Sequence, residues 1–230
     1  MMLLEYIQKR QQMLEEKTDF YTPAGIQVFT KDQMINDSIS VESAIAKYES
    51  KLPDHIRNEV EMIIVGHFDE FEERDINAFY KDGALYVSNF QSNNDDLLDD
   101  LVHETAHSLE EAYGFEIYGD EKIKQEFLSK RINLYHLLWD IGFKIQKRLF
   151  TDLEYNQEFD EFLLQDVGYD RLSGILKGVF VSPYAATSLR EYFATAFTEF
   201  YLYPDSHNYL QKVSPEVYKK LVLLHKLDRA

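Results

Sequence analysis

Residues 95–113, DDLLDDLVHETAHSLEEAY, have the spacing of an amphipathic helix. At about 100° of rotation per residue, the apolar side chains of this segment gather on one side of the helix. His103 and His107 fall near the opposite side, among acidic neighbours. Such a helix can bury one face in a core and present the other face to a cleft. The apolar set is Leu97, Leu98, Leu101, Val102 and Leu109.

His103 and His107, with Glu104 directly after the first histidine, have the spacing of a zinc site. Residues four apart are neighbours on one helix face, so two imidazoles can bind one metal ion at nearly tetrahedral angles. Glu104 projects beside the metal, where its carboxylate can take a proton from metal-bound water. The alternative is an ordinary pair of histidines on a solvated face. The other five histidines lack ligand spacing, and cysteine is absent, which excludes thiolate ligands.

A catalytic zinc ion keeps three protein ligands and one open position, so a third ligand is required. No histidine follows closely after His107, and we expect a carboxylate on a later helix, for which residues 188–201, SLREYFATAFTEFY, are the best candidate. Glu191 is the predicted ligand. The alternatives are a capping box in which Glu191 serves Ser188, or ligation by Glu199. Glu191 and Glu199 are eight residues apart, about 12 Å along a helix, so both cannot reach the same ion.

The remaining pattern predicts an α+β fold, in which a small antiparallel sheet is followed by a mostly helical remainder. Residues 61–65 are typical of a short strand, and residues 78–80 and 84–88 flank an Asp-Gly turn in a hairpin pattern. Residues 1–55 are expected to be a helical segment, either appended to the domain of residues 56–230 or part of it. Helices are expected near residues 2–17, 40–51, 95–113, 120–141, 157–166, 188–203 and 214–227.

Charge and composition argue against several classes of protein. The 230 residues include 24 basic and 41 acidic ones, and the formal net charge of −17 repels phosphate backbones and anionic membrane surfaces. We therefore expect neither nucleic acid nor a membrane as a partner. The first residues lack the pattern of a signal peptide, and no run approaches the roughly 18 apolar residues of a membrane span. A cytoplasmic location is expected, and the absence of cysteine agrees with it.

Three elements, taken in order, resemble the metallopeptidase domain of anthrax lethal factor and its relatives, which include the secreted Pro-Pro endopeptidases of Gram-positive bacteria. The first element is LVHETAH, residues 101–107, with the acidic Glu110 three positions further on. The second is EYFATAF, residues 191–197, whose first glutamate corresponds to the third zinc ligand of the family. The third is Tyr184, seven residues before Glu191, at the place of a tyrosine that stabilises the transition state in the family. The resemblance covers roughly residues 60–227 and implies a zincin-like fold.

The sequence departs from the family pattern in two ways. The family usually has a second glutamate four residues after the ligand glutamate, where this sequence has Thr195, so support for the ligands would come from another residue such as Glu199. The stretch between His107 and Glu191 is also longer than the resemblance leads us to expect. This added length predicts a reshaped cleft, and the substrate preferences of the family are not carried over.

Together these features predict a zinc-dependent endopeptidase that acts on a peptide or protein substrate. Residues 84–88 are expected to form an open sheet edge on which an extended substrate docks, the alternative being a hairpin strand with both edges paired. The alternative function is a non-catalytic interaction or assembly module whose zinc is structural, although such a site has no use for Glu104. The predicted site residues are His103, His107 and Glu191 as zinc ligands, Glu104 as general base and Tyr184 as oxyanion donor.

Overall fold

The structure is a computed structural model, and it describes residues 19–74 and 76–227. Contacts within the chain divide it into two compact units, residues 1–108 and 109–230. The division falls inside α5 (Asn94–Tyr118), a helix with a kink at Tyr113, and differs from the predicted division after residue 55. The helix predicted for residues 2–17 lies outside the described residues.

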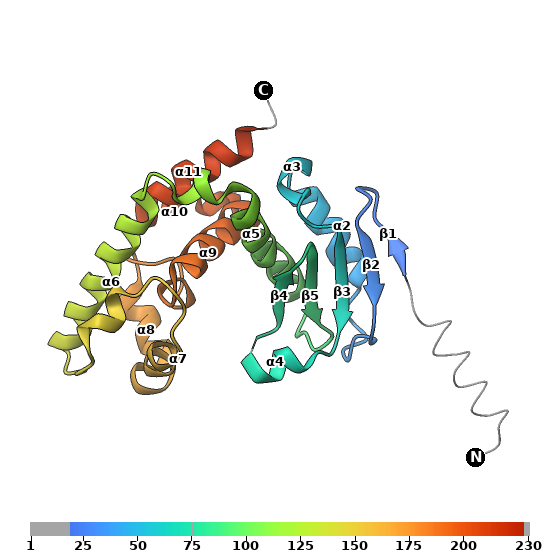
Figure 1. The fold of residues 1–230 in the computed structure, drawn as a ribbon. Helices are drawn as coiled ribbons and strands as arrows, with labels where there is room; N and C mark the ends of the chain where they lie inside the picture. Colours follow the sequence, from blue (N-terminus) through green and yellow to red (C-terminus); the bar gives the residue numbers. More distant parts are fainter. Residues whose placement is uncertain (1–18, 75, 228–230) are drawn as a thin grey trace, which may run out of the picture. The chain divides into compact units, whose positions relative to one another are not determined.

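The first unit is built on a mixed sheet with the strand order β1-β2-β3-β5-β4 (Figure 1). The central strands β2, β3 and β5 run parallel, whereas β1 and β4 are antiparallel to their neighbours. The chain is therefore α+β and mostly helical, as predicted, but the predicted antiparallel sheet is wrong. The strands are β1 (Phe20–Tyr21), β2 (Gln27–Thr30), β3 (Met62–Gly66), β4 (Ala78–Lys81) and β5 (Ala84–Ser88).

The error has a physical reason, because only the hairpin is a local structure. β4 and β5 pair across Asp82 and Gly83, and both of these residues have positive φ, as a tight hairpin turn requires. The parallel pairs instead join strands that are separated by helical connections, which parallel pairing needs and which local periodicity does not reveal. These connections contain α2 (Val41–Lys51), α3 (Asp54–Arg57) and α4 (Asp69–Arg74).

β5 lies between β3 and β4, so both of its edges are paired. The predicted role of residues 84–88 as an open docking edge is therefore wrong. Alternation of apolar residues correctly indicates a strand, but it contains no information about which strands lie on either side. β4 is the edge strand at this end of the sheet, and among the described strands it pairs with β5 alone.

The sheet has two apolar faces of different kinds. On one face the aligned side chains of all three parallel strands are fully buried. On the other face Tyr86 stacks on Phe79 with ring centroids 4.6 Å apart, and Phe68 and Phe71 pack edge-on against this pair. Burial of Leu97, Leu98, Leu101, Val102 and Leu109 confirms the predicted amphipathic character of α5. The buried strand residues are Val28, Ile63, Val65, Leu85 and Val87.

The second unit is helical, and its central element is α9 (Leu189–Leu202). Five side chains of this helix are completely buried, and α6, α10 and α11 all contact it. The start of α9 after Ser188 is confirmed, because the Ser188 hydroxyl accepts a hydrogen bond from the amide of Glu191. The helices around it are α6 (Lys122–Asp140), α7 (Gln157–Glu161), α8 (Tyr169–Leu176), α10 (His207–Val213) and α11 (Pro215–Lys226).

Helices were predicted near 120–141 and 214–227, and α6 and α11 confirm them. The helix predicted near 157–166 is partly confirmed, because α7 ends at Glu161 and a π-helix, η2 (Phe162–Gly168), continues it to α8. Three short 3-10 helices, η1 (Lys147–Thr151), η3 (Tyr184–Ala186) and η4 (Pro204–Ser206), complete the described part of this unit. η3 leads directly into the cap of α9.

Arg131 of α6 is the largest fully buried side chain of the described residues. Its guanidinium lies 3.9 Å from the ring centroid of Phe159 and donates hydrogen bonds to three backbone carbonyls. Two of these carbonyls belong to Ala186, the last residue of η3, and to Thr187, which follows it, and the third belongs to Leu149. Arg131 therefore fixes the backbone that leads into α9.

Replacing Arg131 should destabilise the fold strongly. We expect Arg131→Met to lower the free energy of unfolding by about 3 kcal/mol or more, because each buried carbonyl left without a donor costs roughly 1–3 kcal/mol. Urea unfolding followed by circular dichroism measures the change. Arg148→Met, at an exposed arginine, is the control and should change stability by no more than about 0.5 kcal/mol. Equal effects of the two substitutions would contradict this role of Arg131.

Candidate metal centre

α5 positions two of the three predicted ligands. Asn93 begins the helix, and its side-chain oxygen accepts hydrogen bonds from the amides of Asp95 and Asp96. One turn apart on the helix, the rings of His103 and His107 have centroids 5.2 Å apart and are inclined by 74°. His107 is buried, with 8% of its surface exposed, and His103 is half-buried. The predicted pairing of the two imidazoles on one helix face is therefore present.

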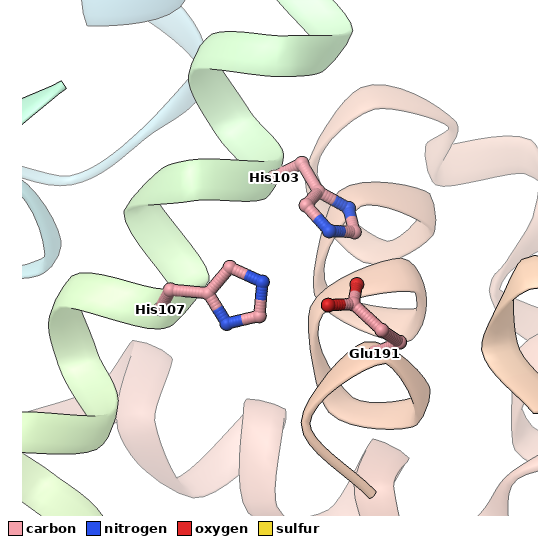
Figure 2. Close-up of side chains that lie close together, drawn as sticks. All are labelled: His103, His107 and Glu191. Carbon is pink, nitrogen blue, oxygen red and sulfur yellow. The ribbon is translucent and has the colours of Figure 1, made fainter. Parts of the chain in front are cut away.

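Glu191 completes the group from the first turn of α9. One ligand atom of each of His103, His107 and Glu191 lies within 4.8 Å of the others. Figure 2 shows the two imidazole rings and the carboxylate directed toward one another from their two helices. Glu199, the alternative carboxylate, does not belong to this group. In the helix cap the backbone amide of Glu191 donates to the Ser188 hydroxyl, and metal binding does not use this amide.

The donor set fits a metal ion. Two imidazole nitrogens and one carboxylate oxygen are a set that catalytic zinc sites use, with a fourth position open to water or substrate. Ligand atoms around a tetrahedral zinc ion are about 3.4 Å apart, given metal–ligand distances of roughly 2.0–2.1 Å. Small side-chain rotations bring donors within 4.8 Å of one another to that spacing. His103, His107 and Glu191 can therefore hold a metal ion.

Glu104 lies next to this group and is fixed by the sheet. Its side chain is buried, with 8% exposed, and its Oε2 accepts a hydrogen bond of 2.9 Å from the backbone amide of Tyr80. Tyr80 belongs to the edge strand β4. A backbone donor thus orients the carboxylate. This contact could not be predicted from sequence patterns, because it joins residues 24 apart and uses a main-chain atom.

Asp100 adds acidity on the same helix. Burial raises the pKa of its carboxyl to about 7, and the negative charges of Glu104 and Asp99 add to this rise, although a hydrogen bond from Gln91 opposes it. The Gln91 amide donates to Asp100 Oδ2 at 2.7 Å. This turn of α5 therefore places the carboxyl groups of Asp99, Asp100 and Glu104 near one another and near His103.

The opposite face of the same turn is held in the core. The hydroxyl oxygens of Tyr48, on α2, and Thr105 are 2.9 Å apart. The Thr105 hydroxyl in turn donates a hydrogen bond to the carbonyl of Leu101. Both side chains are completely buried. Burial also raises the pKa of Tyr48, so its phenol stays protonated and donates to Thr105. Sequence reasoning missed this anchor, since a threonine inside HExxH carries no signal of a distant partner.

Tyr184 lies at the beginning of η3 and is half-buried. Its carbonyl accepts hydrogen bonds from the amide and the hydroxyl of Thr187, and Arg131 fixes the carbonyls of Ala186 and Thr187. The backbone that carries Tyr184 is therefore firmly held. Its predicted part in stabilising an oxyanion stays a prediction.

Thr195 follows Glu191 by one helical turn, at the place where the lethal factor family has a second glutamate. Its hydroxyl is buried, and it has no hydrogen-bond partner among the described residues. Within the described part of the chain, Thr195 therefore makes no hydrogen bond to the ligand groups. Support for Glu191 has to come from other side chains.

Comparisons with protein-family models, with curated proteins and with solved structures give no match. The resemblance to lethal factor relatives therefore rests on the sequence motifs alone. Within residues 19–74 and 76–227, no helix combines the length and apolar character that crossing a membrane requires.

Metal binding should depend on the three residues of this group. We expect wild-type protein to bind one zinc ion per chain, and His103→Ala and Glu191→Ala to lose most of the bound metal. Zinc should also raise the melting temperature of the wild type but not of these variants, because a ligand that binds only the folded state stabilises it. Elemental analysis and thermal unfolding measure the two effects. Glu199→Ala is the control, and loss of zinc in Glu199→Ala but not in Glu191→Ala would show that the wrong carboxylate was assigned.

Proposed function

We propose that the chain is a zinc-dependent endopeptidase that hydrolyses peptide bonds, with Glu104 as the general base. The observation that carries the proposal is the convergence of His103, His107 and Glu191, with Glu104 fixed directly beside the first ligand. A zinc ion held by such a group acts as a Lewis acid and lowers the pKa of bound water to about 7. The protein supplies the ligands, the base and a way to align the substrate.

The orientation of Glu104 suits proton transfer. Tyr80 donates to Oε2, so this oxygen is held by the strand and the proton is taken up at Oε1. The same carboxyl group then delivers the proton to the departing amine, which needs one acid–base group within reach of both atoms. A structural zinc site has no use for a buried carboxylate of this kind, and this favours the peptidase over the non-catalytic module.

β4 offers the alignment for an extended substrate. As the edge strand it can accept a further strand, and main-chain hydrogen bonds then fix the peptide without regard to its side chains. The Tyr80 amide that reaches Glu104 belongs to this strand, so β4 and the general base are directly linked. In this proposal β4 takes the docking role that the sequence assigned to β5.

The general base is tested by an isosteric substitution. We expect Glu104→Gln to keep its zinc and its fold but to lose nearly all hydrolysis, because the amide cannot accept the proton. Digestion of a peptide library, analysed by mass spectrometry, measures activity, and elemental analysis measures zinc. Glu111→Gln, at an exposed glutamate of the same helix, is the control. Activity of Glu104→Gln within about tenfold of wild type would rule out this role, and a wild type that binds zinc but cleaves nothing would favour the non-catalytic module.

Tyr184 is the proposed donor to the oxyanion. Negative charge grows on the carbonyl oxygen during attack, and a neutral phenol can donate to it without competing for the metal. We expect Tyr184→Phe to lower kcat by roughly ten- to a thousandfold with little change in KM, as for an interaction made only in the transition state. Steady-state kinetics on a cleaved peptide measures both constants, with Tyr21→Phe at an exposed tyrosine as the control. A raised KM with unchanged kcat would show that Tyr184 contacts the bound substrate but does not stabilise the transition state.

A further inference from the structure

Glu110 of α5 has a nearly buried carboxylate with two strong donors. Its side chain is 9% exposed, and its Oε2 accepts a hydrogen bond of 2.6 Å from Nε of Arg190. Its Oε1 accepts a short hydrogen bond from the hydroxyl of Tyr118. Both carboxylate oxygens thus accept hydrogen bonds from donors on different helices. A solvated surface glutamate, in contrast, needs no such fixed partners.

Two of these residues, Glu110 and Arg190, lie close to the metal ligands in the sequence. Glu110 follows His107 by three positions on α5, and Arg190 directly precedes Glu191 on α9. The ion pair therefore joins the helix turn after His107 to the helix turn that bears Glu191. The ring of Tyr118 also packs against Phe193, with centroids 6.1 Å apart. Glu191 consequently lies between two held positions, Arg190 and Phe193.

The donor and acceptor roles in this network are fixed by charge. Burial raises the pKa of Tyr118 well above its usual value, and the Glu110 charge raises it further, so the phenol remains a donor. The guanidinium of Arg190 can only donate, and its Nε donates to Glu110 Oε2. Glu110 thus accepts from two donors. A glutamine in its place has one acceptor oxygen and would direct an NH₂ group at one of the donors.

We propose that Glu110 is a positioning residue, which sets the first turn of α9 through Arg190 and Tyr118 so that the Glu191 carboxylate faces the two histidines. The inference rests on the metal site of the proposed function but not on hydrolysis. It assigns to Glu110 and Arg190 a support that Thr195, whose hydroxyl has no hydrogen-bond partner among the described residues, does not give. Partners that orient metal ligands in this way commonly change metal affinity by about 10- to 100-fold when they are removed.

Metal affinity of the folded protein tests the proposal. Zinc dissociation constants are measured by competition with a chromophoric chelator for the wild type, Glu110→Gln, Arg190→Gln and the double variant. We expect each single variant to bind zinc about 10- to 100-fold more weakly. The double variant should be little weaker than either single one, because both substitutions break the same link. Glu111→Gln, at the adjacent exposed glutamate, is the matched control and should bind zinc as the wild type does.

A second readout separates positioning from general stability. The visible spectrum of cobalt(II) bound at the site reports the coordination of the ion, and we expect it to change in Glu110→Gln and Arg190→Gln but not in Glu111→Gln. Arg190 has a half-exposed side chain, so its variant should fold even where Glu110→Gln does not. Wild-type zinc affinity and an unchanged cobalt spectrum in a folded Arg190→Gln protein would overturn the proposal, whatever happens to the melting temperature.

The outcomes also distinguish this inference from the proposed function. A wild type that binds zinc but cleaves no peptide removes the peptidase proposal and leaves the role of Glu110 open to the same affinity test. A wild type that binds zinc and cleaves peptides, with unaltered affinity in both variants, removes the role of Glu110 alone. A wild type that binds no zinc overturns both.

Discussion

One helix, α5, has to satisfy two demands at once, and the rest of the structure depends on how it does so. Its apolar face, which includes Leu101, Val102 and Ala106, is fully buried. The side chains of His103 and His107 project from another face of the helix. A helix buried on one face cannot rotate without exposing that face, so burial of the leucines fixes the direction of the imidazoles. The Tyr48–Thr105 contact adds a polar restraint to the same turn.

Local patterns were enough to predict the parts that depend on local physics. The periodicity of residues 95–113 predicted α5 and its buried face, the Asp-Gly turn predicted the β4–β5 hairpin, and Ser188 predicted the start of α9. The prediction of Glu191 rather than Glu199 required more than periodicity, since both occur on α9 at polar positions. It agrees with the group that the structure forms, and the family motif supplied the decisive signal.

Contacts between distant segments could not be predicted in the same way. The parallel pairing of β2, β3 and β5 depends on crossovers through α2 and α4, and it determines that β5 is central and β4 is the edge. The Tyr80–Glu104 bond follows from that order but leaves no trace in side-chain chemistry, because its donor is a backbone amide. The Glu110–Arg190 pair joins residues 80 apart, and only the acidic residue after His107 hinted at it.

The position of acidic residues near the candidate metal ligands adds information that the net charge alone does not contain. A net charge of −17 argues against partners with phosphate groups, but it does not show where in the structure the acidic side chains lie. On α5, burial raises the pKa of Asp100 to about 7, and the nearby charges of Glu104 and Asp99 add to this rise. A divalent cation bound by the neighbouring histidines would relieve the repulsion among these charges, because an opposite charge favours the ionised form of each carboxyl. If a metal ion is bound there, the acidity beside the ligands would favour its binding, and metal binding would then stabilise the folded form of this turn.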